Sequence, residues 1–139
     1  MPERIYARSR DNQFLIEAEA VRIGPDVLIY LWGGERPHIG SVAAAQAGPS
    51  LKDPAQISAT ASVITFPGHK EDVIVKEAAE YMAAELDANV VVTAGMHWDD
   101  LSAEEIAVVV ANCRDVVHEL LLKLQRLAAC RTIRAEAKI

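Results

Sequence analysis

The sequence predicts a single α/β (α+β) domain, in which a mostly antiparallel sheet of about five to six strands packs with two main helices. Strand-like segments bounded by glycine and proline fill the first half of the chain, and helical periodicity begins only near residue 70. The 139 residues, 51% of them hydrophobic, suffice for one packed core. We therefore expect one domain over 1–139, with a core of about 13–130 and a basic tail of 131–139.

Four segments of the first half carry strand patterns. Apolar and charged residues alternate over 13–23, which is typical of a half-buried strand. The continuous apolar run 27–32 is typical of a strand covered on both faces, and we expect it to be central in the sheet. The segments 38–47 and 58–66 are rich in small or β-branched residues and are bounded by proline or glycine, so both are interpreted as strands.

The second half contains two predicted helices around one predicted strand. Three- and four-residue spacing of apolar side chains predicts a helix over 70–86, and a β-branched strand follows over about 89–98. A capping box at Ser102 and Glu105 opens a long helix over 102–129. At roughly 40 Å, that helix exceeds what a domain of this size can cover. Its distal half either packs on a partner or second copy, which predicts a homodimer through this helix, or frays as a basic tail.

Composition limits the classes of partner. The formal net charge is -6, opposite in sign to the basic surface that binds nucleic acid or anionic membranes, so we expect neither. No apolar stretch approaches the roughly 20 residues of a membrane-spanning helix, and the first residues lack a signal-peptide pattern. The two cysteines both fall near the predicted second helix and form no disulfide framework. These features predict a cytoplasmic protein.

Three segments at strand ends each carry a histidine, and together they form the candidate site. They are 33–40, 67–72 and 94–99. Loops outside strand ends are where ligand sites are usually built, so a shared pocket is plausible. The candidate residues are Gly34, Arg36, His38, Gly40, Gly68, His69, Lys70, His97, Trp98 and Asp99.

The chemistry of these residues suits an anionic, flat ligand. The amides around Gly68 and Lys70 at the start of the first helix could bind an anionic group, although water could equally satisfy them. Arg36 could pair with a phosphate or carboxylate, although its segment requires only a turn. Trp32 and Trp98 could each stack on a flat ligand, or simply pack at the rim.

Catalytic alternatives have weaker support. His38, His69 and His97, with Asp99 or Asp100, have ligand types suited to zinc or iron, but no local metal-binding motif joins them. We therefore expect no metal, and a metal-dependent enzyme is the third hypothesis. Cys113 lies on the apolar stripe of the second helix, where a thiol is inert, and no nucleophile elbow is present.

Taken together, the segments 33–40, 67–71 and 94–99 resemble the LpdD-like prenylated flavin chaperones, also described as the D-type subunits of gallate decarboxylases. The resemblance spans about 26–124. It implies a fold like that of proteasome assembly chaperones and a non-catalytic role in delivering or maintaining prenylated FMN for a partner aromatic-acid decarboxylase. By motif match, the residues that would carry ligand or partner contacts are Gly34, Arg36, His38, Gly40, His69, Lys70, His97 and Asp99. The alternative from another class is a structural assembly chaperone without a small-molecule ligand.

Overall fold

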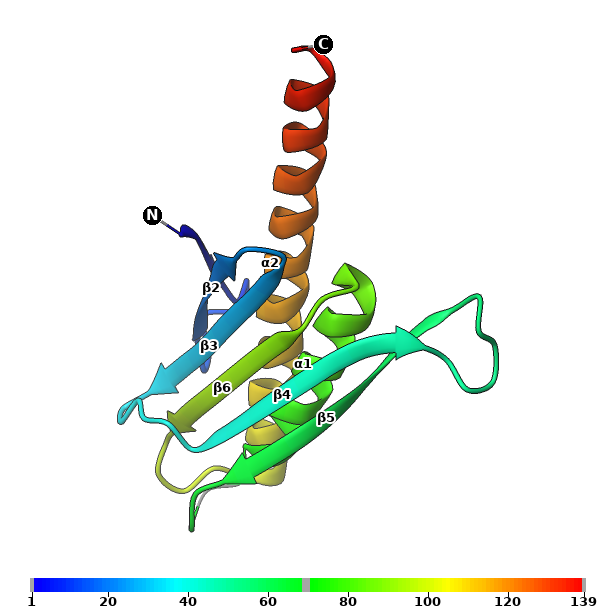
Figure 1. Cartoon of the computed structure of the whole chain (residues 1–139). Coiled ribbons are helices and arrows are strands. Elements are labelled where there is room, and N and C mark those ends of the chain that lie inside the picture. The colour runs from blue at the N-terminus through cyan, green and yellow to red at the C-terminus, as the bar shows by residue number, and fades with distance from the viewer. Residues whose placement is uncertain (1, 69–70, 139) are drawn as a thin grey trace.

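The computed structural model describes residues 2–68 and 71–138, and over these residues the chain forms one six-stranded sheet and two helices (Figure 1). The elements in chain order are β1 (Glu3–Arg8), β2 (Ile16–Ile23), β3 (Asp26–Gly34), β4 (Ser41–Pro49), β5 (Ile57–Thr65), α1 (Asp72–Leu86), β6 (Val90–His97) and α2 (Ala103–Glu136). The predicted fold class, a mostly antiparallel sheet with two helices and a long C-terminal one, is confirmed.

The strand order in the sheet is β1-β2-β3-β6-β4-β5. Four neighbouring pairs are antiparallel, and only β3 and β6 run parallel. These two strands occupy the middle of the sheet, as the sequence predicted for β3. Because they run in the same direction, the segments that follow them leave the sheet at the same edge.

Both helices pack on one face of the sheet, and the opposite face stays open (Figure 1). α1 contacts β4, β5 and β6, whereas α2 contacts β1 and β2. Along β3, buried side chains alternate with half-buried ones such as Tyr30 and Trp32. The prediction that this strand is covered on both faces is therefore wrong. Its continuous apolar pattern arises because the open face also carries apolar side chains.

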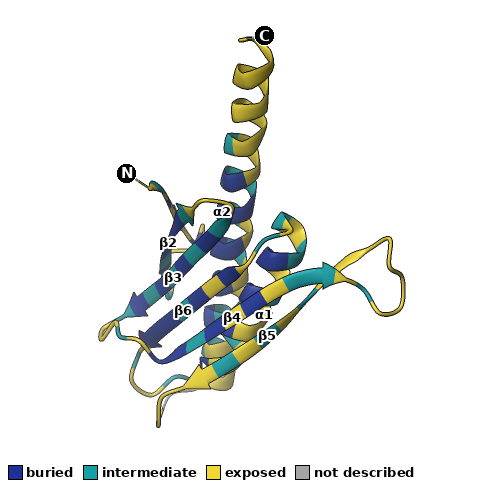
Figure 2. Ribbon diagram, viewed as in Figure 1, coloured by how far each residue is buried: buried dark blue, intermediate teal, exposed yellow. Residues whose placement is uncertain are grey.

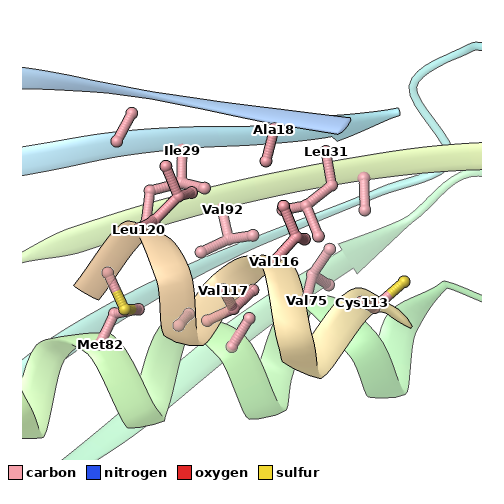
Figure 3. Packing of buried hydrophobic residues seen from close by; sticks show 14 of the residues in the cluster. Ala18, Ile29, Leu31, Val75, Met82, Val92, Cys113, Val116, Val117 and Leu120 are labelled. Atoms are coloured by element: carbon pink, nitrogen blue, oxygen red, sulfur yellow. The ribbon is translucent and has the colours of Figure 1, made fainter. Parts of the chain in front are cut away.

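The core lies between the sheet and the two helices (Figure 3). Ile29 and Val92 of the central strands meet Met82 of α1 and Val116 and Leu120 of α2, and all five are fully buried. This core contains most of the apolar positions of the predicted helical stripes, whereas Val73 and Ile106 are exposed. Burial of each such side chain stabilises the fold by about 1.5–3 kcal/mol before entropy is counted.

Strand β1 is not among the predicted strands. Its exposed residues Arg4, Tyr6 and Arg8 alternate with Ile5 and Ala7, which are buried in the core. This is the period-2 pattern of a short edge strand with a charged outer face. Its polar composition concealed the alternation.

Helix α2 continues past the predicted end at residue 129 to Glu136, a length of about 50 Å. Residues 131–136, predicted as part of a basic tail, are therefore helical, and the interpretation of a frayed tail is wrong for them. Arg131 bonds to Glu3 at the start of β1, which ties the distal helix to the sheet edge. Figure 2 shows this distal part almost entirely exposed. Within the described residues, no helix has the apolar length to cross a membrane.

Candidate functional site

The ends of β3 and β6 bring three of the predicted site residues into one charged cluster. The Arg36 guanidinium donates to Asp99 Oδ1 at 2.8 Å, and His97 Nε2 lies 2.9 Å from the same oxygen. The hydrogen bond from His97, and next the charge of Arg36, hold the pKa of the Asp99 carboxyl below its usual value. The Arg36 side chain is 68% exposed, so its other donors face solvent.

Gly34 allows this cluster to form. It pairs with His97 in the parallel register and has a φ of 83°, in the left-handed region that glycine adopts readily. A Cβ at this position would overlap the backbone of His97. The turn after β3 therefore needs glycine at position 34, because the backbone of His97 approaches so closely.

A second cluster lies beside the first and centres on a residue that the sequence did not indicate, Glu71. Its carboxylate Oε1 lies 3.3 Å from His38 Nε2 and accepts a hydrogen bond from the Met96 N–H at 3.3 Å. The other ring nitrogen of His38 lies 2.9 Å from the carbonyl oxygen of Arg36. The His38 ring is thus held between two oxygen atoms and connects the two clusters.

Glu71 is only 7% exposed, which is unusual for a carboxylate. Among the described residues, its Oε2 atom has no hydrogen-bond partner. Gly40 lies directly against this carboxylate, and a Cβ there would overlap it. The only sequence signal for Glu71 was indirect, because a helix start without Ser, Thr, Asp or Asn at its cap leaves the capping position open to another role.

A shallow apolar pocket of about 550 Å³ lies on the open face of the sheet, next to His38. Tyr30 and Trp32 stack on each other with ring centroids 5.7 Å apart, and Tyr6 lies 6.5 Å from Trp32. The pocket volume falls within the range of small-molecule sites. The lining residues are Leu28, Tyr30, Leu31, Trp32, Pro37, His38, Ile39 and Thr93.

The two tryptophans that the sequence singled out lie in different surroundings. Trp32 lines the open-face pocket, whereas Trp98 packs edge-to-face on Phe14, with centroids 5.3 Å apart, and borders the core. A Cβ on Gly33 would also press on the Trp98 ring. Trp32 is therefore the tryptophan available to stack on a ligand in this pocket, and Trp98 has a packing role.

The predicted anion site at the start of α1 is described only in part. Gly68 is exposed with a φ of 82°, and His69 and Lys70 lie outside the described residues. Glu71 occupies the N-cap position of α1 without a side-chain capping bond. Anion binding at this helix start therefore stays a prediction.

Two further candidates from the sequence are a metal site and the Cys113 thiol. Over residues 2–68 and 71–138, no three His, Cys, Asp or Glu side chains are grouped to hold a metal ion. Burial, and next the charge of Glu71, raise the pKa of the Cys113 thiol to about 12. At neutral pH this thiol is protonated, which agrees with the inert role predicted for it.

The site thus combines an aromatic pocket, an exposed arginine and a pair formed by the half-buried His38 and the buried Glu71, on a sheet whose other face is covered by helices. Such an arrangement offers aromatic, cationic and polar groups that could contact a ligand. The family model described as "Prenylated flavin chaperone LpdD-like domain" matches residues 10–125, so the chain belongs to the LpdD-like prenylated flavin chaperone family. Protein LpdD of Lactiplantibacillus plantarum is 28% identical over 108 residues, covering 74% of this chain and 72% of the relative.

The fold is also similar to a solved structure of distant sequence. A chain in the crystal structure of a chaperone complex for yeast 20S proteasome assembly superposes with a TM-score of 0.53 at 12% identity. The match covers 90% of this chain and 96% of that one. At this identity the likeness concerns the fold alone, and it agrees with the fold that the resemblance implied.

Proposed function

We propose that this protein binds prenylated FMN, or a related flavin phosphate, and delivers or maintains it for a partner aromatic-acid decarboxylase, without catalysing a reaction itself. This proposal rests on the aromatic pocket beside Arg36, found in a chain that belongs to the prenylated flavin chaperone family. The two free cysteines support a cytoplasmic setting, where thiols stay reduced.

The open-face pocket suits the flavin ring system. An isoalloxazine ring is flat and largely apolar, and the stacked Tyr30 and Trp32 offer it an aromatic surface. Ile39, which is 61% exposed at the pocket rim, offers apolar area for the prenyl-derived part of the molecule. His38 lines the pocket with its ring, because its two nitrogens already face oxygens of Glu71 and Arg36.

Arg36 is the group best suited to the flavin phosphate. It follows the same strand as Trp32 and lies two residues before His38, so it adjoins the pocket. Its guanidinium is exposed and can bind a phosphate with two parallel hydrogen bonds. Asp99 holds the guanidinium in place in the free protein and would compete with the phosphate for it.

Binding and transfer are tested together. Purified protein is titrated with FMN and with prenylated FMN by calorimetry, and the loaded protein is then mixed with apo-decarboxylase. We expect one flavin per chain, and Arg36→Ala to weaken binding by about ten- to hundredfold. Arg10→Ala is the matched control, because Arg10 also forms an exposed Arg-Asp pair but lies beside α2. Absence of saturable binding, or equal loss in both variants, would contradict the proposal.

The yeast chaperone likeness favours a second candidate, a structural assembly chaperone that uses protein contacts alone. It predicts that the decarboxylase partner binds with unchanged affinity whether or not flavin is present. Pull-down of the apo-decarboxylase by wild type and by Arg36→Ala, each with and without FMN, separates the two candidates.

A further inference from the structure

The last turns of α2 form a helical arm, residues 125–136, that projects beyond the sheet (Figures 1 and 2). Apart from the half-buried Leu127, its side chains are exposed, and Ile133 is 64% exposed. Such an isolated stretch is marginally stable as a helix without packing on a neighbour. Arg131 bonds to Glu3, but Cys130 and Ile133 remain open to a partner.

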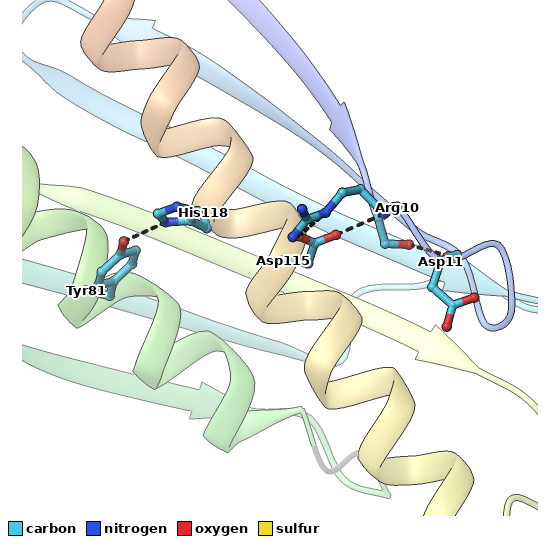
Figure 4. A network of polar contacts seen from close by, with 6 residues as sticks. Arg10, Asp11, Tyr81, Asp115 and His118 are labelled. Atoms are coloured by element: carbon cyan, nitrogen blue, oxygen red, sulfur yellow. Dashed lines mark hydrogen bonds and ion pairs between the residues drawn. The ribbon is translucent and has the colours of Figure 1, made fainter.

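A groove lies on the outer side of the two helices. It has a volume of about 270 Å³, and apolar side chains of α1 and α2 form its floor, among them Ile74, Ala78, Val110 and Val117. Tyr81 and His118 meet across it at 3.0 Å (Figure 4). The lining runs over 110–118 on α2, about 13 Å of helix, which the arm of about 18 Å can span.

The arm and helix α1, which forms one wall of the groove, carry opposite net charges. Arg126, Arg131 and Arg134 give the arm three positive charges against the single negative charge of Glu136. Helix α1 carries one lysine against four acidic residues, namely Asp72, Glu77, Glu80 and Glu85; of these, Glu77 lines the groove, where Arg114 of α2 donates to it at 2.8 Å. In a chain with a net charge of -6, this local excess of positive charge favours docking on an acidic surface.

We propose that the arm of one copy docks in the groove between α1 and α2 of a second copy, and that the two copies exchange arms. In this dimer the two α2 helices pair antiparallel, with residue 114 of one copy opposite residue 130 of the other. Each arm then lies in the groove of the other copy, and one two-fold axis near Leu122 relates the two copies. Such an interface is closed and self-complementary. It uses the helix-in-groove mode of recognition and leaves the open face of the sheet free for a ligand.

A cross-linking experiment tests the contact directly. Tyr81→Cys places a thiol on the groove, while Cys130 supplies the natural thiol of the arm. We expect a short bismaleimide to join them into a covalent dimer. The control Gln56→Cys places the thiol in the loop between β4 and β5 instead. Equal cross-linking in both variants, or none in Tyr81→Cys, would overturn the proposal.

The oligomeric state gives the second test, by light scattering after gel filtration. We expect a dimer for the wild-type chain and a monomer for Ile133→Asp. Ile64→Asp is the matched control, because Ile64 is 67% exposed but lies on β5. Circular dichroism verifies that each variant is folded. A monomeric wild type, or a dimer lost in Ile64→Asp but kept in Ile133→Asp, would overturn the proposal.

Charge reversal tests whether the dimer depends on the opposite charges of the arm and helix α1. The double variant Arg126→Glu with Arg134→Glu is expected to be monomeric, and so is Glu77→Lys with Glu80→Lys. Mixed in equal amounts, the two double variants are expected to form a mixed dimer in which both arm-groove contacts are again matched in charge. Failure of the mixture to associate, with each variant folded, would contradict the charge argument.

Discussion

The carboxylate of Glu71 lies directly against the Cα of Gly40, with no room for a side chain between them. This contact joins the start of α1 to the loop that precedes β4. Through Glu71, it also fixes His38, because the carboxylate oxygen lies 3.3 Å from the imidazole. The position of a pocket residue therefore depends on a glycine that does not touch the pocket.

Gly40→Ala tests this relationship. The added methyl group would overlap the carboxylate, and we expect a loss of about 1–3 kcal/mol in the free energy of unfolding, as for other overpacked sites. Urea denaturation measures this free energy of unfolding. Gly48→Ala is the control, since a Cβ there meets nothing within 4 Å, and its stability should stay at or slightly above that of wild type. Equal stabilities of the two variants would show that the contact is not tight.

Asp99→Asn tests the competition for Arg36. The substitution removes a negative charge from the place where a phosphate would bind, so we expect FMN to bind about two- to tenfold more tightly. Titration at low ionic strength measures the affinity, and high salt should reduce the difference. Weaker binding in Asp99→Asn would indicate that the carboxylate orients Arg36 for the ligand instead of competing with it.

The two cysteines should differ in reactivity. Cys113 is buried, and its thiol pKa is raised to about 12, whereas Cys130 is exposed on the arm. We expect a thiol reagent at mildly alkaline pH to label one cysteine per native chain of the Ile133→Asp variant, in which the arm is undocked, and both cysteines in urea. Cys130→Ser should abolish the native labelling. Rapid labelling of Cys113 in that variant would show that the core between the helices opens readily.

Asp115 and Arg10 should make stability depend on pH in the acid range. Arg10 donates to the Asp115 carboxylate at 2.7 Å from its side chain and at 2.9 Å from its backbone N–H (Figure 4). The hydrogen bond from the Arg10 side chain lowers the pKa of this carboxyl in the folded state. The stabilisation is therefore complete above the unfolded value of about 4 and is lost as the pH falls through the lower folded value.

Comparison with Asp115→Asn measures this contribution. The wild-type chain should be more stable by about 0.2–1 kcal/mol near neutral pH, because Arg10 is largely exposed, and the two chains should converge below about pH 4. Arg10→Gln should show the same profile. A difference that persists unchanged to pH 2.5 would mean that Asp115 acts through packing instead of charge.

The sequence predicted the elements better than it predicted their contacts. Periodicity placed most strands and both helices, because it reflects which side chains face the core. The pairing of β3 with β6, which brings Arg36 to Asp99, joins segments more than 50 residues apart and has no local signal. Glu71 resembled an ordinary exposed residue at a helix start. Its burial follows only from the adjacency of β4 and β6.

Trp32 provides the most direct test of flavin binding on the open face. Two single-tryptophan variants, Trp98→Phe and Trp32→Phe, are titrated to saturation with FMN and prenylated FMN while tryptophan fluorescence is followed. We expect strong, saturable quenching when Trp32 is retained and much weaker quenching when only Trp98 remains. Equal quenching in both variants, or no saturable change in either, would contradict a flavin site on the open face of the sheet.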